Sequence, residues 1–232
     1  MLPEYAAKII KRTDVDTVKT TIEPGLTRAD LERWVTDFGR RIVDQHEALS
    51  DLDAFSGDAD HGSNMERGLS SLLTVMGEWD PAGRPGDFLK DVGLHIVGSV
   101  GGSSGALYGT MFLRMARAVG DATVVTDDLL VAAFEGAAQG VIDRGKVRPG
   151  DKTMLDALGP AVEALRQGLA NGASRSSALL AAAAAADAGR EATADMVARR
   201  GKSSYARDRS RGVVDPGSAS AAMLVRAAAA TL

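Results

Sequence analysis

Apolar residues recur every three or four positions along most of this chain, which is the spacing of one buried face of an α-helix. The clearest case runs from Thr27, a helix-capping type of residue, to about Leu49. Its apolar stripe consists of Leu31, Trp34, Val35, Phe38, Ile42 and Val43. The same pattern, punctuated by Gly, Pro or Asp, predicts further helices over residues 62–78, 87–99, 103–119, 127–143, 152–170, 174–200 and 217–231. Sustained alternation with a period of two is hard to find, so we expect an all-α fold of about eight antiparallel helices joined by short loops.

The composition excludes several classes of protein. The 232 residues suffice for one large domain or two small ones. A net charge of −4, with basic and acidic residues interspersed, argues against a nucleic-acid-binding surface. The absence of Cys excludes disulfides, thiolate metal sites and Cys nucleophiles. The N-terminus has no apolar signal core and no apolar run approaches a membrane span, so we expect a cytoplasmic protein with neither nucleic acid nor membrane as a partner.

The first residues stand apart from the helical pattern. A short amphipathic stretch near Tyr5 is separated from the rest by Pro24-Gly25, a pair that interrupts helices. We therefore divide the chain into an N-terminal extension, residues 1–26, and a main domain, residues 27–232. The extension either packs loosely or serves a partner, and a frayed terminus is an equally good interpretation.

Three aspartates lie within eight residues, Asp53, Asp58 and Asp60, in a segment broken by Gly57 and closed by Gly62. Such carboxylates repel one another unless a cation neutralises them, and ligands that are all oxygen favour Mg²⁺ or Ca²⁺. An EF-hand loop fails on register, because it would place His61 where glycine is needed and Arg67 where the bidentate glutamate belongs. We expect a site that only partly wraps its ion and leaves room for phosphate oxygens. The alternative is a solvated acidic turn that caps the next helix.

Two segments offer groups for binding phosphate. Residues 98–105 are rich in glycine, contain Ser103 and Ser104, and precede a predicted helix whose N–H groups would face an anion. Residues 61–64, His-Gly-Ser-Asn, open the helix after the acidic loop. Each segment alone is also explained as an ordinary helix start. The P-loop and dinucleotide-binding glycine patterns are absent, and His46 and His95 are interpreted as structural.

Four blocks in order make a family resemblance specific. They are residues 52–65, residues 101–105, residues 144–154 with Arg-Gly-Lys and Pro-Gly-Asp-Lys-Thr-Met, and Asp215-Pro216-Gly217. Together they resemble the nucleotide-binding L subunit of dihydroxyacetone kinase, over about residues 27–232. The resemblance implies a barrel of eight helices that holds ADP and two Mg²⁺ ions at one end.

The same resemblance implies roles for individual residues. It implies that Asp53, Asp58 and Asp60 are the metal ligands. Phosphate contacts are implied for His61, Gly62, Ser63, Asn64, Ser103 and Ser104. The nucleoside would lie near Gly145, Met154, Lys202, Asp215, Pro216 and Gly217, with Met154 offering apolar surface to adenine and Lys202 meeting a phosphate as a point charge. No residue is assigned a catalytic role, and Lys152 and Asp156 are interpreted as structural.

The resemblance also implies a reaction. In this family the ketose is held by a histidine on a separate subunit or domain, so we expect this chain to be half of an enzyme that transfers a phosphoryl group with Mg-ADP or Mg-ATP. We favour the form coupled to the phosphotransferase system, in which bound ADP is rephosphorylated by a phosphohistidine protein. The alternatives are an ATP-dependent subunit, one acting on another acceptor such as erythrulose, and an ADP-bound regulatory subunit. The expected partner is a ketose-binding kinase subunit, and a homodimer is among the assemblies considered.

Overall fold

Eight α-helices and two short 3-10 helices make up the part of the chain that the computed structural model describes, residues 24–55 and 57–232. The α-helices are α1 (Arg28–Ala54), α2 (His61–Met76), α3 (Pro85–Ser99), α4 (Gly102–Val119), α5 (Asp127–Gly145), α6 (Leu155–Ala170), α7 (Arg175–Ala192) and α8 (Pro216–Thr231). The 3-10 helices η1 (Thr193–Asp195) and η2 (Lys202–Ser210) lie between α7 and α8. The fold is all-α, as the sequence predicts.

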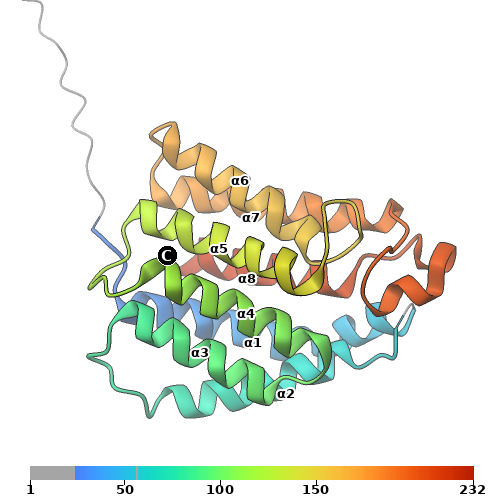
Figure 1. Ribbon diagram of the computed structural model, residues 1–232, viewed down its shortest axis with the longest axis horizontal. Coiled ribbons are helices and arrows are strands. Elements are labelled where there is room, and N and C mark those ends of the chain that lie inside the picture. The colour runs from blue at the N-terminus through green and yellow to red at the C-terminus, as the bar shows by residue number, and fades with distance from the viewer. Residues whose placement is uncertain (1–23, 56) are drawn as a thin grey trace, which may run out of the picture.

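Successive helices run antiparallel and pack side by side (Figure 1). Each helix contacts the next along the chain, and α8 returns to pack against α1, so the contacts form a closed ring. Because the direction alternates, α2, α4, α6 and α8 all begin at the same end of the molecule. The closed ring agrees with the barrel that the resemblance implies, and the barrel itself stays a prediction.

The first helix shows why this sequence folds as it does. The Thr27 hydroxyl accepts a hydrogen bond from the Asp30 backbone N–H, while the Asp30 carboxylate accepts one from the Thr27 N–H, which completes a capping box. The predicted stripe is buried from Leu31 to Ile42. Trp34 stacks on Phe134 of α5 and donates its indole N–H to a backbone carbonyl of α8 at 3.0 Å. The stripe therefore joins α1 to helices far away in the sequence.

The last helix is the most buried element of the ring. Alanine and serine dominate its surface, so neighbouring helices can approach it closely. Its buried residues are Pro216, Ser218, Ala219, Ser220, Ala221, Ala222, Leu224, Val225, Ala227 and Ala228. Small side chains on nearly every side of α8 thus replace the aromatic bulk that the sequence lacks.

Three predicted boundaries are wrong. The helix predicted from Thr27 to about Leu49 continues to Ala54, because Leu49 and Asp53 extend its buried face. The helix predicted over 174–200 ends at Ala192, where the Thr193 hydroxyl accepts the Asp215 N–H at 2.9 Å and the chain continues in 3-10 turns. The helix predicted over 152–170 begins only at Leu155, since Lys152 adopts a positive φ of 61° that no α-helix accommodates. All three deviations lie at the end of the molecule where α2, α4, α6 and α8 begin.

The opposite end of the molecule is closed by contacts to the first described residues. Leu26 and Val125 exchange two backbone hydrogen bonds, at 2.8 and 2.7 Å. The buried Arg175 donates to the Pro24 carbonyl at 3.0 Å and to Asp127 at 2.6 Å. Residues 1–23 of the predicted extension lie outside the described part, so the division at residue 26 stays a prediction. Across the described residues, the helices are too short or too polar to cross a membrane.

Candidate functional site

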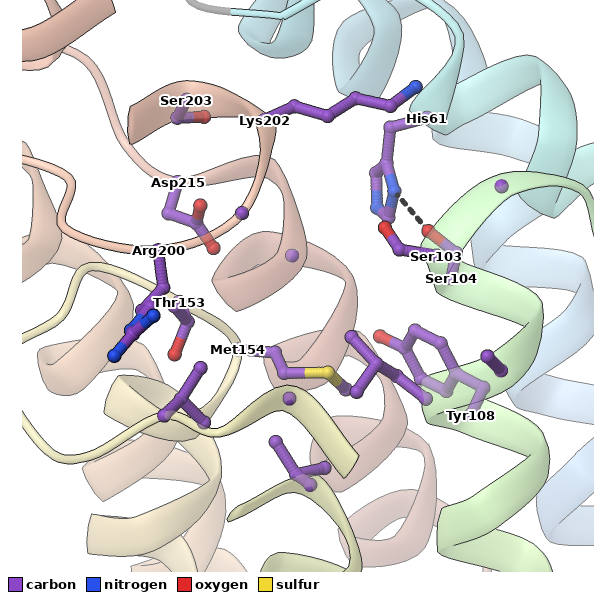
Figure 2. Close-up of a pocket in the computed structure, with 18 of the residues that line it drawn as sticks. His61, Ser103, Ser104, Tyr108, Thr153, Met154, Arg200, Lys202, Ser203 and Asp215 are labelled. Atoms are coloured by element: carbon purple, nitrogen blue, oxygen red, sulfur yellow. Dashed lines mark hydrogen bonds between the residues drawn. The ribbon is translucent and has the colours of Figure 1, made fainter. Parts of the chain in front are cut away.

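The beginnings of α2, α4, α6 and α8 surround a pocket of about 510 Å³ (Figure 2). The pocket is lined by Asp60, His61 and Asn64 from the α2 side, by residues 101–104 at the start of α4, by Thr153 and Met154 before α6, and by Asp215 and Gly217 at α8. Residues 200–203 of the segment between α7 and α8 complete the wall. Each helix start carries a partial positive charge on its unpaired N–H groups, so their convergence favours an anionic ligand.

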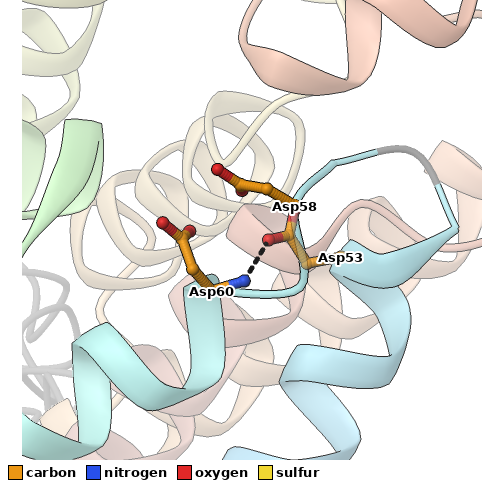
Figure 3. A group of neighbouring side chains, drawn as sticks. All are labelled: Asp53, Asp58 and Asp60. Atoms are coloured by element: carbon orange, nitrogen blue, oxygen red, sulfur yellow. Dashed lines mark hydrogen bonds between the residues drawn. The ribbon is translucent and has the colours of Figure 1, made fainter.

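Two residues of the acidic triplet, Asp53 and Asp60, line this pocket. Figure 3 shows the three side chains together. Asp53, Asp58 and Asp60 each place a carboxylate oxygen within 4.8 Å of the others. Asp53 is buried at the end of α1, and one of its oxygens accepts hydrogen bonds from the backbone N–H groups of Asp60, at 3.0 Å, and His61, at 3.1 Å. The capping alternative is therefore realised by Asp53 alone, while Asp58 is exposed and Asp60 half-buried.

A cation already stands between two of these carboxylates. The Lys202 ammonium lies 2.5 and 2.7 Å from the oxygens of Asp58 and 3.1 Å from both oxygens of Asp60. The hydrogen bond from Lys202 lowers the pKa of Asp58, and the same contacts raise the pKa of Lys202 against the opposing effect of its partial burial. Asp58 and Asp60 thus fit a cation, because a positive group lies against both of them, and Asp53 has a carboxylate oxygen within 4.8 Å of each. The sequence predicts Lys202 near a phosphate and does not predict this pairing.

Two glycines allow the loop to close on itself. A Cβ at Gly57 would lie 2.2 Å from a carboxylate oxygen of Asp53, and a Cβ at Gly62 would lie 1.8 Å from the backbone carbonyl of His46. Both distances are far below van der Waals contact. The first glycine therefore leaves room around the Asp53 carboxylate, and the second lets the start of α2 pack directly on α1.

His61 joins three helices at the base of the pocket. Its Nε2 lies 3.0 Å from the Ser220 hydroxyl of α8 and its Nδ1 lies 3.0 Å from the Ser104 hydroxyl of α4. Ser220 donates its proton to the Gly217 carbonyl and accepts from Tyr108, so we assign the ring proton to Nε2 and the Ser104 proton to the bond with Nδ1. Burial lowers the pKa of His61, which agrees with a neutral ring.

The start of α4 offers the uncapped N–H groups of the pocket. Gly101 stands at its N-cap position without a side-chain hydrogen bond to the helix, and Gly102 has a positive φ of 65°. Ser103 is exposed beside them. These groups are available to an anion in the pocket, whereas the α8 start is capped by Asp215, which accepts from the Ser218 N–H at 2.7 Å. Burial raises the pKa of Asp215 to about 7.

The other wall of the pocket is apolar. It consists of Met154 and of residues that were not predicted from the sequence: Leu107, Tyr108, Val141 and Val147. Apart from the Tyr108 hydroxyl they offer no polar group, and α4, α5 and the segment after α5 bring them together only in three dimensions. Arg144, Thr153 and Arg200 were also missed. A flat apolar group with an anionic tail would match this wall and the helix starts opposite it.

Most of the residues predicted for the site meet at the pocket. Those that line it are Asp53, Asp60, His61, Asn64, Ser103, Ser104, Gly145, Met154, Lys202, Asp215 and Gly217. Asp58, Gly62, Ser63 and Pro216 stand behind or beside its lining, and the Ser63 hydroxyl donates to the Asp60 carbonyl at 3.1 Å. The ligand contacts of all these residues stay predictions.

Comparisons with known proteins point in the same direction. The model of the DAK2 domain matches residues 56–230. The ADP-binding subunit DhaL of the PEP-dependent dihydroxyacetone kinase from Escherichia coli (strain K12) is 40% identical over 204 residues, which cover 87% of this chain and 95% of that protein. The ADP-binding subunit DhaL of the PTS-dependent dihydroxyacetone kinase from Lactococcus lactis subsp. lactis (strain IL1403) is 32% identical over 208 residues, covering 90% of this chain and 94% of that protein.

A solved structure shares the fold. The crystal structure of the dihydroxyacetone kinase from C. freundii in complex with AMP-PNP and Mg²⁺ aligns with a TM-score of 0.68 at 24% identity. The alignment covers 95% of this chain and 37% of the kinase chain, so this chain spans little more than a third of that protein. The family match, the two relatives and the shared fold agree with the four sequence blocks, and the chain belongs to the family of DAK2 domain proteins.

Proposed function

We propose that this chain is the nucleotide-binding, phosphoryl-transferring subunit of a kinase for dihydroxyacetone or a similar short ketose. The observation that carries the proposal is the convergence of four helix starts and an acidic triplet on one pocket. Relatives whose names describe ADP-binding subunits of dihydroxyacetone kinase, at 40% and 32% identity, support it.

We assign the phosphates and the adenine of the nucleotide to different walls of the pocket. Asp53, Asp58 and Asp60 would hold Mg²⁺, with two ions as our proposal, and the bound metal would neutralise phosphate charge in the transfer. The N–H groups at the start of α4 would bind phosphate oxygens, and Lys202 would turn from the carboxylates to a phosphate once a metal replaces it. The apolar wall around Met154 would take the adenine.

The pocket favours a partner for the ketose. His61 lines the pocket, but both of its ring nitrogens are hydrogen-bonded to serine hydroxyls at 3.0 Å. It is therefore not placed to bind a ketose covalently. We therefore propose that a separate ketose-binding subunit presents the acceptor. We further propose that a phosphohistidine protein of the phosphotransferase system recharges ADP that stays bound, in line with the PTS-dependent relative.

The first test is cofactor retention. Protein purified without added nucleotide should release close to one equivalent of ADP on denaturation, and Asp58→Asn protein should release almost none. A nucleotide-free wild-type preparation that binds and exchanges ATP would replace the phosphotransferase-coupled form with the ATP-dependent one.

The second test is reconstitution. The chain alone should leave dihydroxyacetone and erythrulose unphosphorylated with any donor, and a ketose-binding subunit should restore turnover of one of them. Phosphoenolpyruvate with phosphotransferase proteins is compared with ATP as donor. Turnover by the isolated chain would refute the need for a partner, and nucleotide binding without turnover in any combination would favour a regulatory subunit.

A further inference from the structure

The segment between α7 and α8, residues 193–213, forms one wall of the pocket and is called the site loop here (Figure 1). Its tip carries Lys202, the residue that reaches across to Asp58 and Asp60. Gly201 and Gly212 have positive φ values of 70° and 94°, and Arg207 has one of 50°. The loop has two bonds of its own between its ends, from the Gly212 N–H to the Ala194 carbonyl at 2.8 Å and from the Ala198 N–H to the Ser210 hydroxyl at 2.9 Å. Its tip lies at the start of η2, an irregular 3-10 segment, so contacts from outside the loop add to what fixes Lys202.

The buried ammonium group of Lys152 is hydrogen-bonded to both ends of this loop. Lys152 is only 2% exposed, and its Nζ donates to the backbone carbonyls of Thr193 at 2.8 Å, Ser210 at 2.6 Å and Val213 at 2.6 Å. A fourth carbonyl, that of Met196, lies at 3.3 Å. An ammonium has three protons, and the three short bonds use them on carbonyls from the beginning and the end of the loop.

The residues next to Lys152 in the sequence connect these hydrogen bonds to the pocket. Lys152 has a positive φ of 61° and is followed directly by Thr153 and Met154, which line the pocket. The Asp151 carbonyl accepts from the Arg199 N–H at 3.0 Å, which adds a backbone contact at the same place. One short segment thus forms part of the pocket wall and also holds the loop that faces it.

Burying a cation costs free energy unless it is well hydrogen-bonded, so an ordinary apolar side chain would serve better if filling space were the task. Here the acceptors are carbonyls of one loop, whose tip delivers a charge to the acidic triplet. We propose that Lys152 is a positioning residue that ties the two ends of the site loop together and thereby sets Lys202 over Asp58 and Asp60. What Lys202 does there for Mg-ADP rests on the function proposed above.

Limited proteolysis tests the tie without any ligand. The site loop contains six trypsin sites, Arg199, Arg200, Lys202, Arg207, Arg209 and Arg211. Lys152→Met keeps an unbranched side chain of similar length and removes the ammonium, and Lys90→Met on the exposed surface of α3 is the matched control. We expect cleavage within the site loop to become about tenfold faster in Lys152→Met and to stay unchanged in Lys90→Met, because an untied loop opens more often. Unchanged cleavage in Lys152→Met would overturn the proposal.

A double-mutant cycle separates positioning from general stabilisation. Binding of Mg-ADP is measured for wild type, Lys152→Met, Lys202→Met and the double variant. If Lys152 acts through Lys202, its loss should weaken binding about tenfold in the wild-type background and about twofold or less when Lys202 is already Met. An equal loss in both backgrounds would assign Lys152 a merely structural role. Wild-type protein that does not bind Mg-ADP would refute the proposed function, while the cleavage experiment would still decide the role of Lys152.

Labelling of the wild type covers the case in which Lys152→Met does not fold. Acetylation of the native protein, followed by mass spectrometry, should modify Lys90 quickly. Lys152 should be modified much more slowly, because its ammonium becomes accessible only when the site loop opens. Labelling of Lys152 as fast as Lys90 would show that its ammonium is not held by the loop, and would overturn the proposal.

Discussion

Asp53 shows how much one carboxylate contributes at the residue scale. One of its oxygens accepts hydrogen bonds from the N–H groups of Asp60 and His61, and His61 is the first residue of α2. The same carboxylate lies within 4.8 Å of the carboxylates of its two acidic neighbours. Asp58 takes part in the acidic cluster but caps no helix, and its charge is exposed. The two residues therefore differ in what they do before any ligand binds.

Substituting each by Ala should separate these contributions. Both Asp53→Ala and Asp58→Ala should lose the rise in melting temperature that Mg-ADP produces in the wild type. In EDTA, only Asp53→Ala should lower the free energy of unfolding, by roughly 1 kcal/mol, the usual cost of a lost helix cap. Urea titrations and melting curves measure the two effects. Thr27→Ala is the control, because it removes a cap at the start of α1 and should leave the Mg-ADP shift intact. Equal stability of Asp53→Ala and wild type in EDTA would contradict the capping role.

Asp215 should make the stability of the ligand-free protein depend on pH. Burial raises the pKa of Asp215 to about 7 in the folded protein, from an ordinary value of 3.8. Between these values the folded state binds the extra proton, so this group makes the free energy of unfolding fall as the pH rises. Asp215→Asn keeps an acceptor for the cap and should flatten that dependence. Urea midpoints in EDTA across this range check it, and equal slopes for both proteins would count against a protonated Asp215.

Residue types and spacing were enough to predict the acidic cluster and the two segments, residues 61–64 and 98–105, that contribute to the pocket, because both are local in sequence. Their binding of phosphate stays a prediction. The contacts of His61 with Ser104 and Ser220 were not predictable, since their partners are 43 and 159 residues away. The pairing of Lys202 with Asp58 spans 144 residues. Such pairs depend on how the helices are arranged, and the sequence alone does not contain that arrangement in a readable form.

At the scale of the elements, helix starts were predicted better than helix ends. The capping box at Thr27 and the Asp-Pro-Gly start of α8 are local signals that the structure confirms. The end of α7 has no such signal, because Thr193 stops it by accepting the Asp215 N–H at 2.9 Å, a partner from the start of another helix. The first part of the site loop, residues 193–200, was therefore predicted as a continuation of the helix.

The packing of α2 on α1 should depend on Gly62. A Cβ there would lie 1.8 Å from the His46 carbonyl, so Gly62→Ala should push the helices apart and lower the free energy of unfolding by about 1–3 kcal/mol or more. Gly98→Ala in α3 is the matched control, since no atom lies within 4 Å of the added Cβ and helical propensity favours Ala by up to about 1 kcal/mol. Urea denaturation in EDTA compares the two variants. Wild-type stability of Gly62→Ala would show that α1 and α2 can separate freely.

At the scale of the whole molecule, the alternation of helix direction gives the two ends different tasks. The end where α2, α4, α6 and α8 begin holds the pocket, and the other end holds the short turns and the contacts to Pro24 and Leu26. The sequence predicts an all-α fold with its candidate site residues between helices and in the first turns of helices. Their meeting at one end follows from the antiparallel order, which the short loops already favour.

Insertions at the two ends of the molecule should have different effects on ligand binding. A flexible Gly-Ser insertion of about five residues after Gly172, in the turn between α6 and α7, should cost well under about 1 kcal/mol and leave Mg-ADP affinity unchanged. The same insertion after Gly201 should weaken Mg-ADP binding, because it displaces Lys202 from the pocket, where we propose that it meets a phosphate. Calorimetric titration with Mg-ADP compares both proteins with the wild type. A loss of affinity after the Gly172 insertion would show that the far end also shapes the pocket.

The location of the first and last described residues limits how a second domain could be tethered to them. The first described residues and the C-terminus both lie at the end of the molecule away from the pocket (Figure 1). The 27 residues of α1 run about 40 Å at about 1.5 Å per residue. A linker from either end would thus need about 12 extended residues merely to return to the pocket mouth. Covalent fusion would raise the local concentration of such a domain only with a tether longer than that, whereas a separate subunit approaches the open end directly.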